Sequence, residues 1–250
     1  MNQRDKIVII GATSLIAEHC ARLWLQATPA VLCLVGRDAA RLQRVADDLQ
    51  VRSPASAISV HVADLIDPAA VRGLVDQLCA DEVPAQVLIA HGALPDQAEC
   101  EHDLQAMHDA LVINAISPAL WAQAFAGHLQ RVNRGCLGVI GSVAGDRGRK
   151  SNYVYGAAKG LVERCVQGLQ HRLAATAVRV VLIKPGPTDT PMTAALKQRG
   201  QALAPVAAVA QAIVVGMQRG QPVVYAPGRW RLIMAIIRHL PRFIFHRMDI

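Results

Sequence analysis

The sequence predicts an α/β fold, a doubly wound parallel (Rossmann) sheet in a single domain, with a C-terminal basic amphipathic extension. Apolar runs of strand length alternate along the chain with segments of helical period. Hydrophobic residues make up 52% of the 250 residues and aromatic residues only 4%, which suits parallel strands buried between helices. Glycine and polar residues follow the ends of successive apolar runs, where sheets of this kind bind their ligands.

The same alternation places each element. Strands are predicted near residues 6–10, 31–36, 58–63, 86–90, 135–141, 178–184 and 222–225. Helices are predicted near residues 14–27, 38–50, 68–80, 103–130, 153–175 and 205–219. Asp38 and Asp67 stand at helix N-cap positions, and Pro68 occupies a first helical turn, where proline fits. Residues 1–227 therefore form the predicted Rossmann-type domain, and residues 228–250 form an amphipathic basic segment.

The charge distribution, the N-terminus and the cysteine spacing indicate which partners, location and metal sites to expect. The net charge is +7, but residues 228–250 contain five Arg and one Asp, so the excess lies mainly in one tail and predicts no nucleic-acid binding. Met1 leads through charged residues directly into a strand, so we expect no signal peptide and a cytoplasmic protein. The cysteines at 20, 33, 79, 100, 136 and 165 lack metal-ligand spacing, which predicts buried thiols and no metal site.

Tyr155 and Lys159 carry the strongest chemical signal. They lie four residues apart on a predicted helix, and Ser142 closes the strand that precedes it. This spacing places both side chains on one helical face, where an ammonium favours the tyrosinate and readies the phenol for proton transfer. Tyr and Lys also occur at this spacing by chance, so the pair alone does not decide the function.

A glycine turn follows the first predicted strand. Residues 11–17 connect that strand to its helix, and such a turn brings a pyrophosphate to backbone N–H groups. Gly11 is retained, while Leu15 and Ala17 replace glycines that dinucleotide loops usually have. Thr13 and Ser14 offer hydroxyl groups to a phosphate. An ordinary capped turn is the alternative. The candidate cofactor contacts here are Gly11, Thr13, Ser14, Leu15 and Ile16.

Arg37 and Asp38 end the second predicted strand. An acidic residue at this place binds the ribose 2′-hydroxyl of NAD, whereas an arginine binds the 2′-phosphate of NADP. Arg37 therefore predicts that NADP(H) is preferred over NAD(H). A shift of the loop by one residue would present Asp38 instead, and a solvated position for both side chains is the alternative.

Further candidates follow the third and fourth strands. Asp64 is placed to accept from an adenine amino group or to cap the next helix, and Leu65 is its neighbour. His91 and Gly92 lie where small residues let a cofactor ribose approach the backbone, and His91 is expected to be a loop histidine, not a catalytic base. Asn114 lies in an apolar helix, where an amide needs a partner, either a water near the site or a structural contact.

In their order, the glycine turn, Asn114, Ser142, the Tyr155–Lys159 pair and a Pro185-Gly186-x-x-x-Thr190 segment resemble the short-chain dehydrogenase/reductase family over roughly residues 6–225. The glycine turn and the segment 90–93 depart from the family pattern. The resemblance implies hydride transfer from NADPH to a ketone.

The resemblance also assigns roles. It implies that Ser142 donates to the carbonyl oxygen, Tyr155 supplies the proton, and Lys159 lowers the phenol pKa and bonds the nicotinamide ribose. Asn114 would hold a water that reprotonates the lysine. The segment Thr188 to Thr190, after Pro185 and Gly186, would contact the nicotinamide amide and open a substrate lid. A homo-oligomer is implied as well.

The tail raises the question of substrate and location. Trp230, Ile233, Ile237 and Leu240 share one helical side, and Arg231, Arg238 and Arg242 share another. The stretch is shorter than the ~20 residues of a membrane span, and Pro241 interrupts it. It is suited to the headgroup layer of a membrane. Packing on its own subunit or on a partner is the alternative.

One branch of the family resembles this chain more specifically. The runs 142–147, 149–156 and 238–242 are similar to the decaprenylphosphoryl-2-keto-erythro-pentose reductases, which act on a lipid-linked keto sugar. This resemblance implies that Arg147, Arg149 and Lys150 bind the lipid phosphate. A soluble reductase of small ketones or 3-oxoacyl groups remains open, as does a cofactor-binding sensor without turnover.

Overall fold

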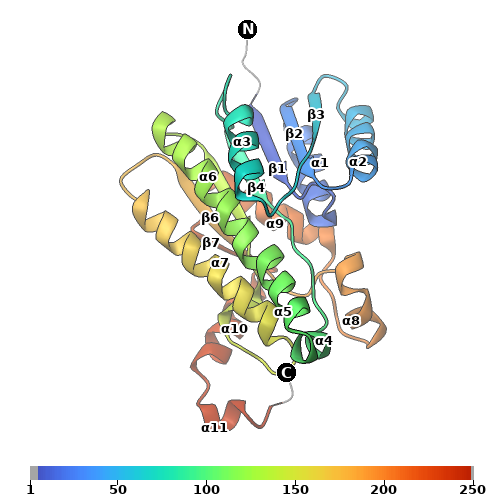
Figure 1. The fold of residues 1–250 in the computed structure, drawn as a ribbon, viewed down its shortest axis with the longest axis vertical. Coiled ribbons are helices and arrows are strands. Elements are labelled where there is room, and N and C mark those ends of the chain that lie inside the picture. Colours follow the sequence, from blue (N-terminus) through green and yellow to red (C-terminus); the bar gives the residue numbers. More distant parts are fainter. Residues whose placement is uncertain (1–4, 249–250) are drawn as a thin grey trace.

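The computed structural model describes residues 5–248 and has the predicted fold class (Figure 1). Seven parallel strands form one sheet in the order β3-β2-β1-β4-β5-β6-β7. The order reverses between β1 and β4, which opens the crevice where such sheets bind ligands. The strands are β1 (Lys6–Ile10), β2 (Val31–Gly36), β3 (Ala57–Val62), β4 (Gln86–Ile89), β5 (Cys136–Ile140), β6 (Arg179–Pro185) and β7 (Val223–Ala226).

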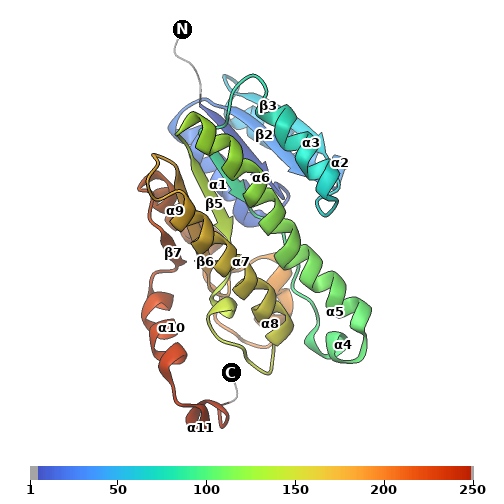
Figure 2. The same ribbon diagram turned by 60° about the vertical axis from the view of Figure 1, so that its left-hand side comes forward.

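Helices cover both faces of the sheet (Figures 1 and 2). One apolar core lies under α1 (Leu15–Ala27), α2 (Ala39–Arg52) and α9 (Val206–Gln218). The other lies under α3 (Pro68–Leu78), α6 (Ser117–Val132) and α7 (Tyr153–Arg172). Both cores consist mainly of Ala, Val, Leu and Ile, as the composition predicts. Of the six cysteines, five are buried, but Cys165 is exposed on α7, so the expectation of buried thiols is wrong there.

The predicted helix 103–130 consists of three pieces. It divides into α5 (Leu104–Leu111), a π-helical turn η1 (Val112–Ile116) and α6. The whole stretch Leu104–Val132 is long and apolar enough to cross a membrane by length and composition. Its α6 part packs on the sheet, because Trp121 and Phe125 are completely buried in the core between them.

Several short elements were not predicted. They are α4 (Gln97–His102), the 3-10 turns η2 (Val143–Asp146) and η3 (Pro191–Thr193), and α8 (Ala194–Gln198). Each has at most six residues, too short to give a helical period.

The C-terminal extension contains α10 (Arg229–His239) and α11 (Arg242–Phe245), separated at Pro241 as predicted. Met234 on α10 is completely buried, and Trp230, Ile233 and Ile237 are half-buried on the same side. The apolar face predicted for a membrane surface therefore packs on its own subunit. The expectations for Met1 and for residues 249–250 lie outside the described residues.

Candidate active site

The predicted catalytic side chains meet at the carboxyl ends of β4 and β5. Ser142 follows β5 and begins η2, where its Oγ accepts a hydrogen bond from the Ala144 N–H at 3.1 Å. Lys159 is only 3% exposed; its Nζ donates to the Ile140 carbonyl at 3.1 Å and lies 5.7 Å from the centre of the Tyr155 ring. Tyr155 is half-buried, and Ser142 is close enough to its hydroxyl to influence the pKa of the phenol.

Burial shifts both titrating groups away from their charged forms. It raises the pKa of the Tyr155 phenol to about 12, and the neighbouring Ser142 offsets part of that rise. It lowers the pKa of the Lys159 ammonium to about 8. Desolvation dominates the net shift of the Tyr155 pKa, and the lowering of that pKa by Lys159 stays a prediction.

Asn114 lies on the π-helical turn and is completely buried. Its Nδ2 donates to the Ala110 carbonyl at 2.9 Å, and its Oδ1 accepts from the Ala93 N–H at 2.9 Å. A β-carbon at Gly92 would lie 2.8 Å from Asn114 Oδ1 and 3.5 Å from Lys159 Nζ. Asn114 therefore fixes the segment after β4, whose Gly92 lies close to both Asn114 and Lys159. π turns of this kind occur frequently at functional sites.

His91 is buried in a separate network. Its Nε2 lies 2.7 Å from Ser117 Oγ, and Ser117 Oγ donates to the Leu65 carbonyl. Because that bond uses the Ser117 proton, Nε2 of the neutral ring is the donor. Burial, with Lys159 and Arg37 nearby, lowers the pKa of His91 to about 3. A neutral, enclosed imidazole fits the prediction that His91 is not a catalytic base.

The glycine turn depends on the positive φ and the small size of Gly11. Gly11 has φ +79°, and a β-carbon there would lie 2.6 Å from the His91 backbone nitrogen. Ser14 is the N-cap residue of α1, and its hydroxyl makes no cap bond. Leu15 and Ile16 are half-buried at the helix start, and Ala17 is completely buried in the core. The residues present thus fit a pyrophosphate at the N-terminus of α1, with the hydroxyl of Ser14 beside it.

Arg37 and Asp38 have different surroundings. Asp38 is the N-cap of α2 and accepts from the Arg41 N–H at 2.9 Å, while Arg37 is exposed at the end of β2. Arg41 Nη2 reaches the Thr13 carbonyl at 3.5 Å, beside a cavity of about 360 Å³. Sequence reasoning missed Arg41, because only the fold brings α2 next to the glycine turn.

Asp64 and Leu65 follow β3. Asp64 is exposed and accepts from the Ile66 N–H at 2.9 Å, whereas Asp67 caps α3. The alternative that Asp64 caps α3 is therefore wrong. The Leu65 side chain is buried in the core, and its carbonyl accepts from Trp121 Nε1 at 3.0 Å as well as from Ser117. The side chain of Leu65 thus belongs to the core, and a cofactor contact at this position stays a prediction.

The loop after β6 is held by internal contacts. Gly186 N–H donates to the Ala226 carbonyl at 3.0 Å, and Thr188 Oγ1 donates to the Gly186 carbonyl at 2.8 Å. Thr190 caps η3 in a box with Thr193. A β-carbon at Gly186 would overlap the indole of Trp230, at 1.9 Å from Nε1. The tail therefore packs directly on the Pro185-Gly186 segment, a contact that the sequence does not reveal.

The three basic residues after Ser142 have separate surroundings. Arg147 Nη1 donates to the Ile237 carbonyl and, at 2.8 Å, to the Leu240 carbonyl, and its guanidinium lies 3.7 Å from the centre of the Phe245 ring. These contacts engage the Arg147 guanidinium with the tail, and its role as a phosphate ligand stays a prediction. Arg149 is half-buried, with a buried Nε that has no partner among the described residues. Lys150 is exposed.

A cavity of about 350 Å³ lies between this loop and the tail. Its lining combines cationic and apolar side chains from two distant parts of the chain. They are Arg149, Lys150, Tyr153, Phe245, His246 and Met248, with Gly148.

A buried charged cluster lies behind the site. Lys184, on β6, contacts the carboxylates of Asp146 and Glu163. Tyr225 on β7 donates to Asp146 at 3.3 Å. Sequence reasoning did not single out any of these residues, because they are far apart along the chain.

Comparison with known proteins identifies the family. The model of the short chain dehydrogenase family matches residues 5–201. An uncharacterized oxidoreductase of Mycobacterium tuberculosis is 34% identical over 247 residues, covering 97% of this chain and 96% of the relative. Sulfoacetaldehyde reductase 2 of Chromohalobacter salexigens is 30% identical over 194 residues, 76% of this chain and 75% of that protein.

Solved structures share the fold. A short-chain dehydrogenase from Sphingobium yanoikuyae in complex with NADPH superposes with a TM-score of 0.82 at 23% identity, covering 95% of this chain and 97% of that one. The bulky-bulky ketone specific alcohol dehydrogenase from Comamonas testosteroni has a TM-score of 0.79 at 22% identity, covering 95% of both chains. The chain belongs to the short-chain dehydrogenase/reductase family and is an NAD(P)-dependent oxidoreductase.

Proposed function

We propose that the protein is an NADPH-dependent ketoreductase with Tyr155 as its acid and base. The observation that carries this proposal is the cluster of Ser142, Tyr155 and Lys159 at the carboxyl edge of the sheet, with the Lys159 Nζ 5.7 Å from the centre of the Tyr155 ring and bonded to the Ile140 carbonyl. It lies beside Gly92 and Asn114, on the same edge as the glycine turn. Bound NADPH supplies the hydride for the carbonyl carbon.

The side chains have distinct tasks in this reaction. Ser142 and Tyr155 donate hydrogen bonds to the carbonyl oxygen, where negative charge develops. With a pKa of about 12, the phenol keeps its proton at neutral pH and is available as the acid. Lys159, with a pKa of about 8, is suited to replace that proton. Asn114 fixes the backbone of Ala93, beside the lysine, through its Oδ1.

We propose a preference for NADP(H) over NAD(H). Asp38 is engaged as a helix cap, so its carboxylate is directed to the α2 backbone while Arg37 remains at the end of β2. Arg41 adds a second guanidinium next to Thr13. Two cations and a threonine hydroxyl at this edge suit a 2′-phosphate better than a ribose hydroxyl.

The proposed substrate is a ketone with an anionic group and an apolar chain, such as a polyprenyl-phosphate-linked 2-keto sugar. The cavity between the loop 148–153 and the tail supports this proposal, because it combines the Arg149 guanidinium with Phe245 and Met248. A soluble reductase of small ketones or 3-oxoacyl groups is the alternative of the same class. A non-catalytic NADP(H)-binding sensor is the alternative of a different class.

NADPH oxidation tests catalysis. The wild type and Tyr155→Phe are assayed with a panel that holds small ketones, 3-oxoacyl thioesters and prenyl-phosphate keto sugars. We expect turnover by the wild type and a loss of about 10² to 10⁴-fold in Tyr155→Phe at unchanged NADPH affinity. NADPH binding without turnover on the whole panel would favour the sensor.

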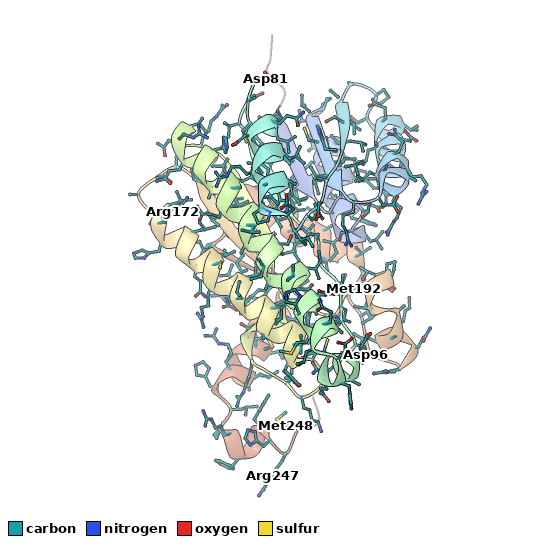
Figure 3. All side chains as sticks on the ribbon, in the orientation of Figure 1. Asp81, Asp96, Arg172, Met192, Arg247 and Met248 are labelled. Atoms are coloured by element: carbon teal, nitrogen blue, oxygen red, sulfur yellow. The ribbon has the colours of Figure 1, made fainter. Side chains whose placement is uncertain are left out.

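The extension also supports peripheral contact with an anionic membrane. Its outer side exposes apolar side chains, with Leu232 69%, Ile236 57% and Phe243 68% exposed. Among residues 228–248, the ionisable side chains are five Arg and two His. A symmetric contact between two copies of this surface would bring like charges together, so an anionic lipid surface suits it better. Figure 3 shows Arg247 and Met248 at the tip of the extension. Assembly into a homo-oligomer elsewhere on the surface is proposed on family grounds.

Vesicle sedimentation tests this contact independently of turnover. We expect the wild type to sediment with vesicles containing phosphatidylglycerol in low salt and to be released by salt. The triple variant Leu232→Ser, Ile236→Ser, Phe243→Ser should stay in the supernatant. Val51→Ser is the matched control, because Val51 is 81% exposed on α2. Equal sedimentation of the triple variant and the control would refute the membrane proposal.

A further inference from the structure

Lys184, Asp146 and Glu163 form a charged cluster inside the catalytic half of the molecule. The Lys184 Nζ contacts Asp146 Oδ1 and lies 2.8 Å from Glu163 Oε2. The side chains of Lys184, Asp146 and Glu163 are 2%, 1% and 10% exposed. Gln167 Nε2 donates to Glu163 Oε1 at 3.1 Å, and the Tyr225 hydroxyl donates to Asp146 Oδ2. Each of the four carboxylate oxygens therefore has a partner.

Such a cluster is not the most stable way to fill a core. Each buried ion loses several kcal/mol of hydration, and well-packed apolar residues are often as stable or more stable at the same place. Burial lowers the pKa of Lys184, but hydrogen bonds to Asp146 and Glu163 outweigh it, so the pKa lies above its usual value. Apolar contacts are not directional, whereas the bonds of an ionic cluster are. They therefore fix the relative positions of the segments that carry the charged side chains.

The three segments are those that carry the candidate active site. Asp146 ends the 3-10 turn that begins after Ser142. Glu163 lies one helical turn beyond Lys159 on α7, and Lys184 immediately precedes Pro185 on β6. The register pairs Lys184 with Tyr225 on β7, the strand that leads into the extension.

Close backbone contacts leave this arrangement little freedom. A β-carbon at Gly156 would lie 2.9 Å from the Ala144 carbonyl, and one at Gly145 would lie 2.9 Å from the Lys159 backbone. The turn η2 thus rests directly on α7, with glycines at both contacts. A small rotation of the turn would move Ser142 relative to Tyr155, and the carboxylate of Asp146 is the anchor at its far end.

We infer that Lys184, Asp146 and Glu163 act as positioning residues, an ionic clamp that holds Ser142 in register with Tyr155 and Lys159 for carbonyl reduction. The inference rests on the proposed function, because the clamp acts through Ser142. None of the three residues needs to touch the substrate or the cofactor.

Steady-state kinetics test the clamp. With the best ketone of the panel, Asp146→Asn should lower kcat about 10 to 100-fold, since a displaced catalytic group costs about that much. NADPH affinity should stay within about twofold, because the glycine turn is on the other half of the sheet. Lys184→Arg should recover more activity than Lys184→Met. Glu82→Gln, which removes the exposed pair with Arg134, is the matched control.

A double-variant cycle separates positioning from general weakening. If Asp146 acts through Ser142, Asp146→Asn should cost less than about twofold in kcat when Ser142→Ala is already present. Full additivity of the two losses, or unchanged kcat in Asp146→Asn, would overturn the clamp. If Lys184→Met does not fold, the variant Asp146→Asn, Glu163→Gln, Lys184→Met leaves no unpaired charge and serves in its place.

Hydrogen exchange provides a readout without turnover. In Asp146→Asn, amides of the segment 141–147 should exchange at least about tenfold faster, while the segment 7–16 is unchanged. Unchanged exchange at 141–147 would reject the clamp even if no ketone is reduced. Failure of the whole ketone panel with faster exchange at 141–147 would reject the proposed function and leave the mechanical linkage established.

Discussion

The half of the molecule around the glycine turn and the half around Ser142 are built on different principles. In the first half, Arg37 and Asp64 are exposed, and the turn depends on backbone geometry at Gly11. In the second half, Lys159 and Lys184 are buried and bonded to fixed partners. Sequence departures from the family fall at Leu15, at Ala17 and in the segment 90–93, while Ser142, Tyr155 and Lys159 match it.

The difference teaches how each half tolerates change. A cofactor bound largely by backbone N–H groups and exposed cations can lose a side chain and lose only affinity. A buried acid and its cation cannot be altered without leaving a charge or a polar group unpaired. We therefore expect substitutions in the catalytic half to change kcat and those in the cofactor half to change the affinity for NADPH.

The largest effect is expected from Lys159→Met. The substitution removes the buried ammonium beside Tyr155, so kcat should fall about 10² to 10⁴-fold. Single-turnover kinetics with saturating NADPH measure it. If Lys159→Met lowered only the affinity for NADPH and retained kcat, the expectation that substitutions in the catalytic half change kcat would be wrong.

His91 should give the next largest effect, on stability. Its pKa is about 3 in the folded protein against 6.5 in an unfolded chain, so the folded state binds fewer protons between these values. The contribution of neutral His91 to the free energy of unfolding is complete above pH 6.5. It declines by about 1.4 kcal/mol per pH unit as the pH falls toward 3. Urea unfolding at pH 8 and pH 5 measures the free energy of unfolding. Its decrease from pH 8 to pH 5 should be smaller in His91→Asn than in the wild type. Equal losses would mean that His91 does not contribute.

The pH dependence of reduction should follow Lys159. Its pKa of about 8 predicts that kcat/KM for ketone reduction declines above pH 8, by up to about tenfold per pH unit, as the ammonium is lost. Tyr155, with a pKa of about 12, should add no decline below that value. In Lys159→Arg the decline near pH 8 should disappear. A decline that persists there would assign the titration to another group.

The smallest effect is expected from Arg37→Ala. Removing one exposed guanidinium should weaken NADPH binding about tenfold and leave NADH binding unchanged, since only NADPH has the 2′-phosphate. Fluorescence titration of both cofactors measures this difference, with Arg44→Ala as a second exposed arginine nearby. Equal affinity of the wild type for both cofactors would contradict the proposed preference.

The sequence predicted what local patterns determine. The alternation of strands and helices placed Gly11, Arg37, His91 and Ser142 at the carboxyl ends of their strands. These ends lie on the same side of the sheet because the strands are parallel. The π turn at Asn114 was missed because a single wide turn leaves the apolar period of the long helix nearly intact.

Contacts between segments that are far apart along the chain could not be predicted from local sequence patterns. Asp146, Glu163 and Lys184 meet only after η2, α7 and β6 are packed, and each has an ordinary surface explanation when considered alone. The tail was assigned the wrong outer face for a related reason. Its helix has apolar residues on both sides, and only the packing of Met234 and Trp230 decides which side is buried.

Transfer of deuterium from NADPH tests the central claim most directly. The protein is incubated with 4-deuterated NADPH of each stereochemistry and the ketone panel, and the alcohol is analysed by mass spectrometry. We expect one stereoisomer to place deuterium on the carbonyl carbon of a ketone in the wild type, and a rate lower by about 10² to 10⁴-fold in Tyr155→Phe. Bound NADPH with no labelled alcohol, or equal rates in the two proteins, would contradict carbonyl reduction by Tyr155.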